Sequence, residues 1–330
     1  MIRNACVIVG LVLALGGCMQ KDMPGESFAG TRGVATAEEH AREEKLREHV
    51  RVLSVEIGLR HVGEHANLVK AAAYVEDELK GMGYAVRSQE WDEGGRPVRN
   101  LDVTIEGKTR PKEIVVMGAH YDSARQSPGA DDNGSGVAAL LEIARMVKDN
   151  PQSRTVRLVF FVNEEPPYFG TSRMGSWQYA RESKRKGEDI RAMIALDSLG
   201  RFSEEPQSQH YPAMLAKEFS DTANFVAFVS RTEDVGLVRD TVGAFREKTP
   251  VPSEGAALPG FLDGVGFSDH WSFWQFGYPA VMVSDTAFFR WREYHTPNDT
   301  MEQIDFLVLT RVTVGLRDVV VSLGEARSKK

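Results

Sequence analysis

Short apolar runs alternate with longer helical segments through the middle of the chain. Four runs have the composition of buried strands and cover residues 113–119, 156–162, 192–197 and 279–285, and a run at 225–230 can add another strand. Continuous apolar strands separated by helices are typical of a mainly parallel sheet that is covered on both faces. The pattern predicts an α/β fold: a single three-layer domain with a mainly parallel, mixed β-sheet and helices on both faces.

Apolar residues at helical spacing predict the segments between these strands. A charged helix is expected over about 37–51, and a second helix over about 66–82. A third helix follows the first apolar run, with Asn133 or Ser135 available to cap its amino end. The chain closes with a long amphipathic helix over about 305–326.

The amino-terminal residues have the pattern of a removable leader. Arg3 precedes an apolar run that ends at Cys18, after which the chain turns polar. The run is too short to span a bilayer comfortably and is typical of a secretory signal peptide. Its end, LGGC, resembles a bacterial lipobox, in which the signal is cut before a cysteine that becomes lipidated; the alternative is a plain signal peptide with a chance cysteine. The small residues Gly16 and Gly17 favour a cell-envelope lipoprotein. Because Met19 rather than an aspartate follows Cys18, we expect this lipoprotein in the outer membrane of a Gram-negative host, facing the periplasm.

These patterns predict the domain organisation. We expect a signal peptide at 1–17, a lipidated Cys18 with a flexible tether that extends to residue 36, and one folded domain over 37–330. Residues 201–262 are less regular and are predicted to form an insertion in this domain.

Charge and cysteine content narrow the chemistry. The formal net charge is −7, from 40 basic and 47 acidic residues, and no dense Lys/Arg run occurs in the body of the chain. Nucleic acid is therefore not expected as a partner. The two cysteines are Cys6, inside the predicted signal, and Cys18. The mature protein then has no internal disulfide, and any metal site must use histidines and carboxylates.

Metal-ligand side chains follow each predicted parallel strand. The carboxyl ends of such strands lie at one edge of the sheet, where ligands bind in open α/β folds. Going along the chain, this edge receives His120, Asp131 and Asp132, Glu164 and Glu165, Asp197, and His295. Each has an ordinary explanation when taken alone, such as helix capping for Asp131–Asp132 or an exposed turn for His295. Convergence from four separate strand ends favours a metal site instead.

Zinc chemistry accounts for the whole set. Zn²⁺ accepts histidine nitrogen and carboxylate oxygen, and two zinc ions about 3.5–4 Å apart can share a carboxylate and a hydroxide. Two histidines, two aspartates and two glutamates supply five ligands and leave one carboxylate free to carry a proton.

Five motifs resemble the co-catalytic di-zinc aminopeptidases, which form peptidase family twenty-eight of the metallopeptidases. They are AHYDS…PGADDNGSG, FVNEEP, ALDSLG, SDHWSFWQFGYPA and YHTPNDT, and the resemblance extends from about Gly58 to the carboxyl terminus. The family also contains glutamate carboxypeptidases and glutaminyl cyclases. The resemblance implies the zinc exopeptidase fold, of the phosphorylase/hydrolase-like type, two Zn²⁺ per chain and peptide substrates.

The resemblance also implies a role for each residue of the site. Asp131 is expected to bridge the two metals, with a cis peptide between Asp131 and Asp132. His120 and Asp197 complete one metal site, and Glu165 and His295 complete the other. The expected general base is Glu164, which serves a hydroxide held between the metals, while the Tyr294 hydroxyl helps to hold the oxyanion. The remaining expected roles, orienting the ligand histidines, belong to Asp122 and Asp269.

One segment departs from the family pattern. After the paired glutamates the family has a Gly-Leu-containing run that leads directly to Gly-Ser, whereas this chain has the longer PPYFGTSRMGS, residues 166–176. The loop is expected to reshape the substrate pocket. An apolar side-chain pocket could be lined by aromatic residues, although such clusters are more often core; the candidates are Trp271, Trp274, Phe288, Phe289 and Trp291.

The favoured function is a zinc-dependent aminopeptidase that removes amino-terminal residues from peptides. One alternative is a carboxypeptidase, with Arg173, Arg290 or Arg292 binding the substrate carboxylate. A second is a single-zinc glutaminyl cyclase, which the complete ligand set disfavours. A third is a non-catalytic surface lipoprotein, which is disfavoured because no metal ligand and no general base is missing from the motifs.

Overall fold

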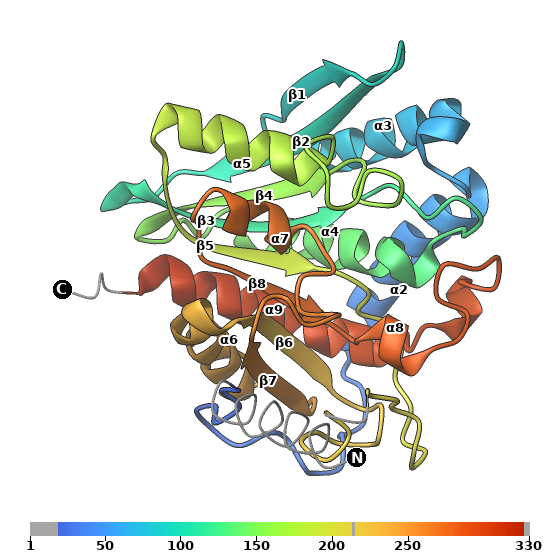
Figure 1. Ribbon diagram of the computed structural model, residues 1–330, viewed down its shortest axis with the longest axis vertical. Coiled ribbons are helices and arrows are strands. Elements are labelled where there is room, and N and C mark those ends of the chain that lie inside the picture. Colours follow the sequence, from blue (N-terminus) through green and yellow to red (C-terminus); the bar gives the residue numbers. More distant parts are fainter. Residues whose placement is uncertain (1–18, 213–214, 327–330) are drawn as a thin grey trace, which may run out of the picture.

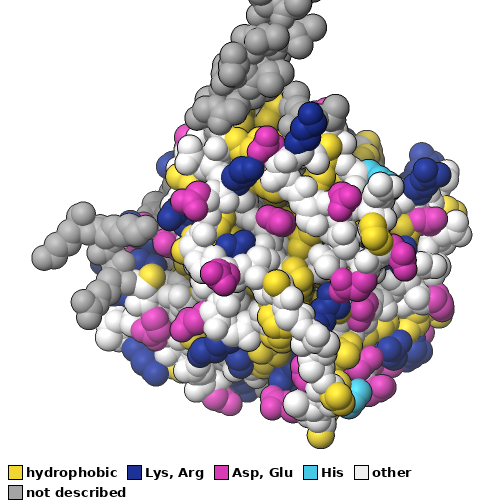
Figure 2. All heavy atoms as spheres, turned by 90° about the horizontal axis from the view of Figure 1, so that it is seen from below, with side chains coloured by type: hydrophobic (Ala, Val, Ile, Leu, Met, Phe, Trp, Pro, Cys, Tyr) yellow, Lys and Arg dark blue, Asp and Glu magenta, His cyan; other side chains and the backbone are white. Residues whose placement is uncertain are grey.

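The computed structural model describes residues 19–212 and 215–326, which form one α/β domain (Figure 1). The predicted signal peptide at 1–17 and the predicted lipidation site Cys18 lie outside these described residues. Within them, no helix has both the length and the apolar character needed to cross a bilayer. On the face seen in Figure 2, basic and acidic side chains are interspersed.

An eight-stranded mixed sheet runs through the domain in the order β1-β2-β4-β3-β5-β8-β6-β7. Its four middle strands β4, β3, β5 and β8 are parallel, whereas β1, β2 and the β6–β7 pair join through antiparallel contacts. The strands are β1 (Arg87–Asp92), β2 (Pro97–Ile105), β3 (Arg110–His120), β4 (Arg154–Phe161), β5 (Asp189–Leu196), β6 (Val226–Arg231), β7 (Ser253–Leu258) and β8 (Ala280–Ser284).

Helices cover both faces of this sheet (Figure 1). One face carries α3 (His65–Gly81), α4 (Gly136–Val147), α6 (Val235–Arg246) and α9 (Phe306–Glu325), with α2 (Ala37–Arg51) packed across α4 and α9. The other face carries α5 (Gly175–Lys186) and α7 (His270–Gln275), and the short α8 (Ala287–Arg290) follows β8. A π-helical turn, Ala130–Ser135, leads from β3 into α4.

Side chains of the middle strands alternate between two apolar cores. On β3, Val115 and Met117 pack into the core under α4 and α9, whereas Ile114 and Val116 face α5 and α7. Because both faces are buried, the later part of each middle strand is almost continuously apolar, which is why these strands could be found as apolar runs.

The predicted strands and main helices are present, and several elements were missed. The helix predicted over 37–51 is α2, and the run at 225–230 is β6. The region 201–262 is not an irregular insertion throughout, because β6 and β7 extend the sheet and α6 connects them. Among its described residues, the longest stretch without helix or strand is the part before β6. Sequence patterns also missed β1 and β2, whose hairpin is partly exposed and interrupted by polar residues.

The described part of the predicted tether packs on the domain rather than hanging free. The backbone of Gln20 exchanges hydrogen bonds with Ala257 of β7, at 2.9 and 2.8 Å. Met23 is buried in the main core, and Ser27 Oγ accepts a hydrogen bond from the Ser253 amide at the start of β7. The segment therefore covers the outer edge of the sheet, which would otherwise expose unpaired backbone groups.

Candidate metal centre

Histidine and carboxylate side chains gather at the carboxyl ends of the parallel strands. His120 is the last residue of β3, Asp197 follows β5 directly, and Glu164 and Glu165 follow β4. A fourth segment, after β8 and α8, supplies His295. Every one of these side chains except His295 is buried. The predicted convergence of separate strand ends is therefore present.

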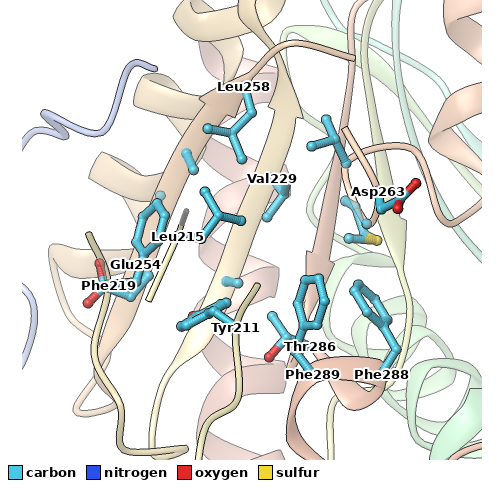
Figure 3. A pocket seen from close by; sticks show the side chains of 16 residues that line it. Tyr211, Leu215, Phe219, Val229, Glu254, Leu258, Asp263, Thr286, Phe288 and Phe289 are labelled. Atoms are coloured by element: carbon cyan, nitrogen blue, oxygen red, sulfur yellow. The ribbon is translucent and has the colours of Figure 1, made fainter. Parts of the chain in front are cut away.

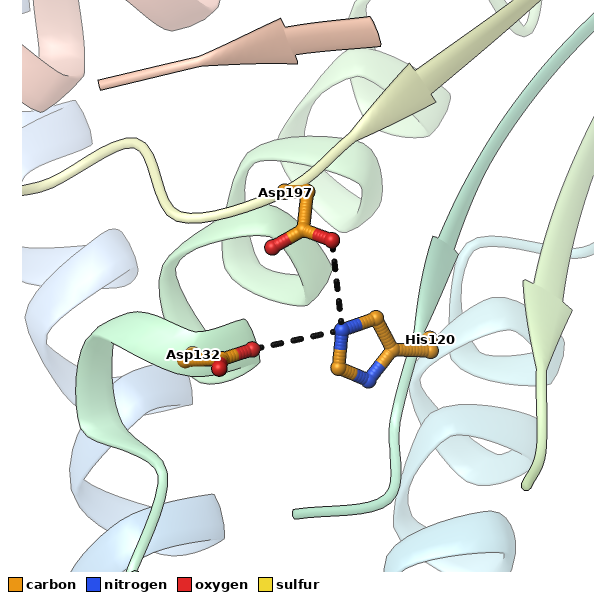
Figure 4. A group of neighbouring side chains, drawn as sticks. All are labelled: His120, Asp132 and Asp197. Carbon is orange, nitrogen blue, oxygen red and sulfur yellow. Dashed lines mark ion pairs between the residues drawn. The ribbon is translucent and has the colours of Figure 1, made fainter. Parts of the chain in front are cut away.

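Three carboxylates surround the imidazole of His120. Its Nε2 lies 3.3 Å from Asp132 Oδ1, 3.6 Å from Asp197 Oδ2 and 3.8 Å from Glu164 Oε2. Figure 4 shows Asp132 and Asp197 approaching this nitrogen from two directions. Nε2 is buried and has no hydrogen-bond partner within the described part of the chain, so it presents a nitrogen lone pair or proton to the space between the carboxylates.

A second group forms around His295 and shares Asp132 with the first. His295 Nε2 lies 3.0 Å from Asp132 Oδ2 and 3.1 Å from Glu165 Oε2. Asp132 thus directs one oxygen toward each histidine, which is the arrangement of a carboxylate that bridges two ions. Two ligands of a tetrahedral zinc lie roughly 3.3–3.5 Å apart when each bond is about 2.0–2.2 Å long.

The donor set therefore fits two divalent metal ions. Nitrogen and oxygen atoms within 4.8 Å of one another form the groups His120–Asp132–Asp197 and Asp132–Glu165–His295. Buried Nε2 of His295 and Oε1 of Glu165 lack hydrogen-bond partners among the described residues, as does Nε2 of His120. Buried polar atoms without partners are costly unless a ligand satisfies them, and a metal ion in each group would do so.

The structure corrects the predicted role of Asp131. Its Oδ1 accepts a hydrogen bond from the Gly200 amide at 2.7 Å, and its carboxyl group pairs with that of Asp285, away from both histidines. Adjacent residues in this turn direct their side chains oppositely, so Asp132 takes the place between the histidines. The cis peptide lies one residue further along as well, between Asp132 and Asn133 rather than between Asp131 and Asp132.

Asp299 and Arg60 hold the turn that carries Asp132, and sequence reasoning missed both. Asp299 accepts hydrogen bonds from the backbone amides of Asp131 at 2.8 Å and Asp132 at 3.1 Å. The fully buried Arg60 donates to the carbonyl groups of Tyr121 at 2.8 Å and Gly129 at 2.6 Å. The presence of Asp299 within YHTPNDT was the available signal, whereas nothing in its sequence context marks Arg60.

Asp122 lies beside His120, where its predicted orienting role requires it, whereas Asp269 forms no hydrogen bond or ion pair with a histidine among the described residues. Asp122 Oδ1 lies 3.6 Å from His120 Nδ1, and its two oxygens accept the amides of Glu164 and Glu165 at 3.1 and 3.2 Å. The carboxylate thereby fixes the backbone of both glutamates, and the backbone carbonyl oxygen of Asp122 holds the histidine ring through a 3.3 Å hydrogen bond with Nδ1. Asp269 is buried near the cluster, and burial raises its pKa to about 7.

Excess negative charge sets the pKa values of the two histidines. Burial lowers the pKa of His120, but the surrounding carboxylates outweigh it and hold the pKa well above its usual value. The same balance raises the pKa of His295 to about 10. Burial would raise the pKa of Asp132, yet the histidines hold it below its usual range, while burial raises the pKa of Glu165 to about 7. The cluster thus favours positive charge at its centre, which bound metal ions would supply.

Tyr294 lies beside the metal centre as predicted from the sequence. Its ring stacks on that of His295, with centroids 3.8 Å apart and an interplanar angle of 21°. Burial and the nearby carboxylates raise the pKa of its hydroxyl well above the usual value. The hydroxyl therefore stays protonated and remains a hydrogen-bond donor at neutral pH.

The predicted aromatic residues divide between a pocket and the core. Phe288 and Phe289 line an apolar pocket of about 500 Å³ on β6, β7 and β8, which Tyr211, Leu215 and Phe219 also line (Figure 3). Phe288 joins this pocket to the metal centre, since its ring lies 6.2 Å from that of Tyr294. The tryptophans are elsewhere: Trp274 and Trp291 are buried in the protein, and Trp271 packs against Trp177 at 5.6 Å.

The arginines considered for binding a substrate carboxylate have other positions. Arg173 pairs with Glu93. Arg290 is buried and donates to Gln209 Oε1 and to the carbonyl groups of Arg201 and Phe225. The guanidinium group of Arg290 is therefore unavailable to a substrate, whereas Arg173, although paired, and Arg292 are exposed.

Residues 100–320 match the family model described as Peptidase family M28. The uncharacterized protein YfbL of Escherichia coli strain K12 is 35% identical over 286 residues, which cover 84% of this chain and 87% of YfbL. Aminopeptidase YwaD of Bacillus subtilis strain 168 is 31% identical over 214 residues, which cover 61% of this chain and 40% of YwaD. The chain thus spans most of YfbL but less than half of YwaD.

Solved structures share the same fold at low sequence identity. BSAP, a zinc aminopeptidase from Bacillus subtilis, aligns with a TM-score of 0.69 and 16% identity over 87% of this chain and 96% of its own. A glutaminyl cyclase from Fimbriiglobus ruber aligns with a TM-score of 0.61 and 19% identity over 91% and 99% of the two chains. These likenesses confirm the predicted three-layer α/β fold, and they do not choose between the two activities.

The two neighbouring aspartates differ in what their replacement should do to metal binding. We expect Asp132→Asn to lower metal occupancy in both groups, because its two oxygens face both histidines. Asp131→Asn is the matched control and should keep both metals, since its carboxyl group faces Gly200 and Asp285. Metal analysis of the purified, dialysed variants measures this difference. Loss of metal in Asp131→Asn with retention in Asp132→Asn would restore the original assignment.

Proposed function

The chain belongs to peptidase family M28, and from that premise we propose that it is a di-zinc aminopeptidase that removes residues from the free amino end of peptides. One observation carries the proposal: two histidine–carboxylate groups, buried except for His295, share Asp132, and a further carboxylate, Glu164, lies beside them. A non-catalytic relative would not need to retain both groups and the additional acid.

His120, Asp132 and Asp197 would hold one zinc ion, and Asp132, Glu165 and His295 the other. When bound, such a pair of ions polarises a carbonyl group and lowers the pKa of water, which is the chemistry of metal-assisted hydrolysis. Asp122 and Asp299 keep the ligands in place through the backbone amides described above.

Glu164 would carry the proton of the reaction. Burial and the neighbouring carboxylates raise its pKa well above the usual value, so its proton affinity is higher than that of an exposed glutamate. In this role Oε2 of Glu164 accepts a proton from the attacking water and returns it to the leaving amide nitrogen. Tyr294 would donate its hydroxyl proton in a hydrogen bond to the carbonyl oxygen as negative charge develops there.

Negative charge around the site supports cleavage at the amino end. Asp197 and Glu164 each have an oxygen within 4 Å of Nε2 of His120, at 3.6 and 3.8 Å, and a substrate ammonium group placed between them would relieve their repulsion. Of the arginines considered for a carboxypeptidase, Arg173 and Arg290 are already engaged. The cyclase and the non-catalytic alternative are distinguished by metal content: two zinc ions per chain support the proposal, one the cyclase, and none the non-catalytic module.

A peptide panel tests the proposed reaction. Peptides with a free amino end and amino-acid arylamides should be hydrolysed, whereas their N-acetylated forms should react at least roughly tenfold more slowly, because the charge-assisted contacts of the ammonium group are lost. Initial rates on matched free, N-acetylated and C-amidated peptides give the comparison. Equal rates on free and acetylated peptides would exclude an aminopeptidase.

The adjacent glutamates should respond differently to the same substitution. Glu164→Gln keeps the shape of the side chain but cannot accept a proton, so we expect a loss of about 10²–10⁴-fold in kcat with both zinc ions retained. Glu165→Gln should lose zinc from the His295 group first, and activity as a consequence. Zinc stoichiometry and turnover are measured on both variants. Loss of zinc in Glu164→Gln with full zinc in Glu165→Gln would reverse the two roles.

We also propose that the mature chain begins at a lipidated Cys18 and is anchored in the outer membrane, facing the periplasm. The support for this is the LGGC sequence and the residue that follows it. A Cys18→Ser variant should leave the membrane fraction and appear in the soluble fraction of the cell envelope. Unchanged membrane association of that variant would contradict the anchor, and labelling with a radioactive fatty acid gives an independent measurement.

A further inference from the structure

An open pocket adjoins the metal centre on the side of Glu165. It has an empty volume of about 960 Å³ and is built by loops from four parts of the chain. The lining comprises His61 to Glu64, Arg96 of the β1–β2 hairpin, Asp122 and Arg125 after β3, and Glu165 to Tyr168 after β4. We call it the proline-loop pocket, after Pro166 and Pro167 in its wall.

This wall is the segment that departs from the family pattern in the sequence. Pro166 and Pro167 follow Glu165 directly, and the Tyr168 amide donates a hydrogen bond to the Glu165 carbonyl at 2.9 Å. This turn connects Glu165, a candidate metal ligand, to Tyr168. The guanidinium carbon of Arg173 lies 4.9 Å from the centre of the Tyr168 ring. Two consecutive prolines restrict the backbone of this wall, so the pocket is held open next to the reacting centre.

Two cations line the pocket without a carboxylate partner. Arg96 and Arg125 are both exposed, and neither forms an ion pair within the described ranges 19–212 and 215–326. The single hydrogen bond of the Arg96 guanidinium goes to the Val62 carbonyl. Of the acidic residues in the lining, Asp122 is committed to backbone amides and Glu165 to the metal centre, and the third, Glu64, is exposed.

His61 adds a donor that has no acceptor. Its Nδ1 accepts a hydrogen bond from the Gly63 amide at 3.0 Å, so the neutral ring carries its proton on Nε2. That Nε2 is buried and lacks a partner among the described residues. The glycine is required for this arrangement, because a Cβ at position 63 would lie 2.7 Å from the ring Cε1 and 2.8 Å from Nδ1. The ring is therefore held in place with an unused N–H group.

We propose that the proline-loop pocket binds a carboxylate carried by the residue on the leaving side of the scissile bond. Two guanidinium groups and an imidazole N–H form a donor set suited to a carboxylate, and arginine binds this group in planar, paired hydrogen bonds. The inference rests on the proposed function and deepens it, because it names the preferred substrates: dipeptides with a free carboxyl end, or peptides with an acidic second residue.

The neighbouring charges explain why cations are needed at this position. Asp122, Glu165 and Glu164 place negative charge at the inner end of the pocket, which would repel a substrate carboxylate. Arg96 and Arg125 offset that repulsion, so that a negatively charged leaving residue is accepted next to an acidic centre. The substrate would then lie with its ammonium group toward Asp197 and its carboxylate toward the arginines.

Matched substrates and variants test the inference. Leu-Ala, Leu-Ala-amide, Leu-Asp-amide and leucine p-nitroanilide are compared on the zinc-loaded enzyme and on Arg96→Gln, Arg125→Gln, the double variant and His61→Ala. Arg185→Gln, an exposed arginine at the far end of α5, is the control. Leu-Ala against its amide measures recognition of the main-chain carboxylate, and Leu-Asp-amide against Leu-Ala-amide measures recognition of a side-chain carboxylate.

We expect the wild-type enzyme to hydrolyse either Leu-Ala or Leu-Asp-amide with a kcat/KM roughly tenfold or more above that for Leu-Ala-amide. Each single arginine variant should lose about threefold to tenfold of this preference, mainly through KM, and the double variant nearly all of it, since the guanidinium groups are solvent-exposed. His61→Ala should lose part of the preference. The p-nitroanilide, which has no carboxylate, should be hydrolysed within about twofold of wild type by every variant and by the control.

The outcomes separate this inference from the proposed function. Hydrolysis of the p-nitroanilide with equal kcat/KM for all three peptides would overturn the carboxylate pocket and leave the aminopeptidase intact. A preference that survives in the double variant would also overturn it. Failure to hydrolyse any of the four substrates by the zinc-loaded wild type would reject the proposed function, and the inference with it.

Discussion

Mutual repulsion among buried carboxylates is the constraint on which this structure depends. Asp122, Asp132, Glu164, Glu165 and Asp269 are at most 5% exposed and lie at one end of the sheet, with Asp197 at their margin. Like charges at short range in a poorly solvated site destabilise one another, and the fold must counter that repulsion or lose the site. The raised pKa values of His120 and His295 report how strongly the cluster favours positive charge.

Backbone amide groups and the buried cation Arg60 offset this repulsion among the carboxylates. Asp122 and Asp299 accept hydrogen bonds from the backbone amides of Glu164, Glu165 and Asp132, whose side chains form the metal centre. Arg60 lies beneath the turn and binds its carbonyl groups. Burial lowers the pKa of Arg60 to about 10, which still leaves it charged at neutral pH. The ligands are therefore preorganised before a metal ion binds.

The sequence was sufficient to predict the strands that are buried on both faces and the residues at their carboxyl ends. Parallel strands buried on both faces give continuous apolar runs, and their carboxyl ends converge in any such sheet, so the site could be located and most of its residues identified. Asp131 and Asp132 could not be told apart, because both are acidic and adjacent, and only the local backbone decides which side chain faces the histidines. Residues 19–33 have a linker-like composition, yet they pack through backbone hydrogen bonds and one buried methionine, which composition does not report.

The segment that covers the edge of β7 also places the amino-terminal part of the described chain relative to the metal centre. β7 is parallel to β6 and β6 is antiparallel to β8, so Ala257, near the carboxyl end of β7, lies at the end of the sheet opposite the metal centre. Gln20 is bonded there, and Figure 1 shows the early part of the chain along this lower border. Any attachment point just before Gln20 is consequently remote from the reacting groups. A membrane reached through that point would lie behind the domain, and peptides would approach the opening from bulk solution without first crossing the lipid surface.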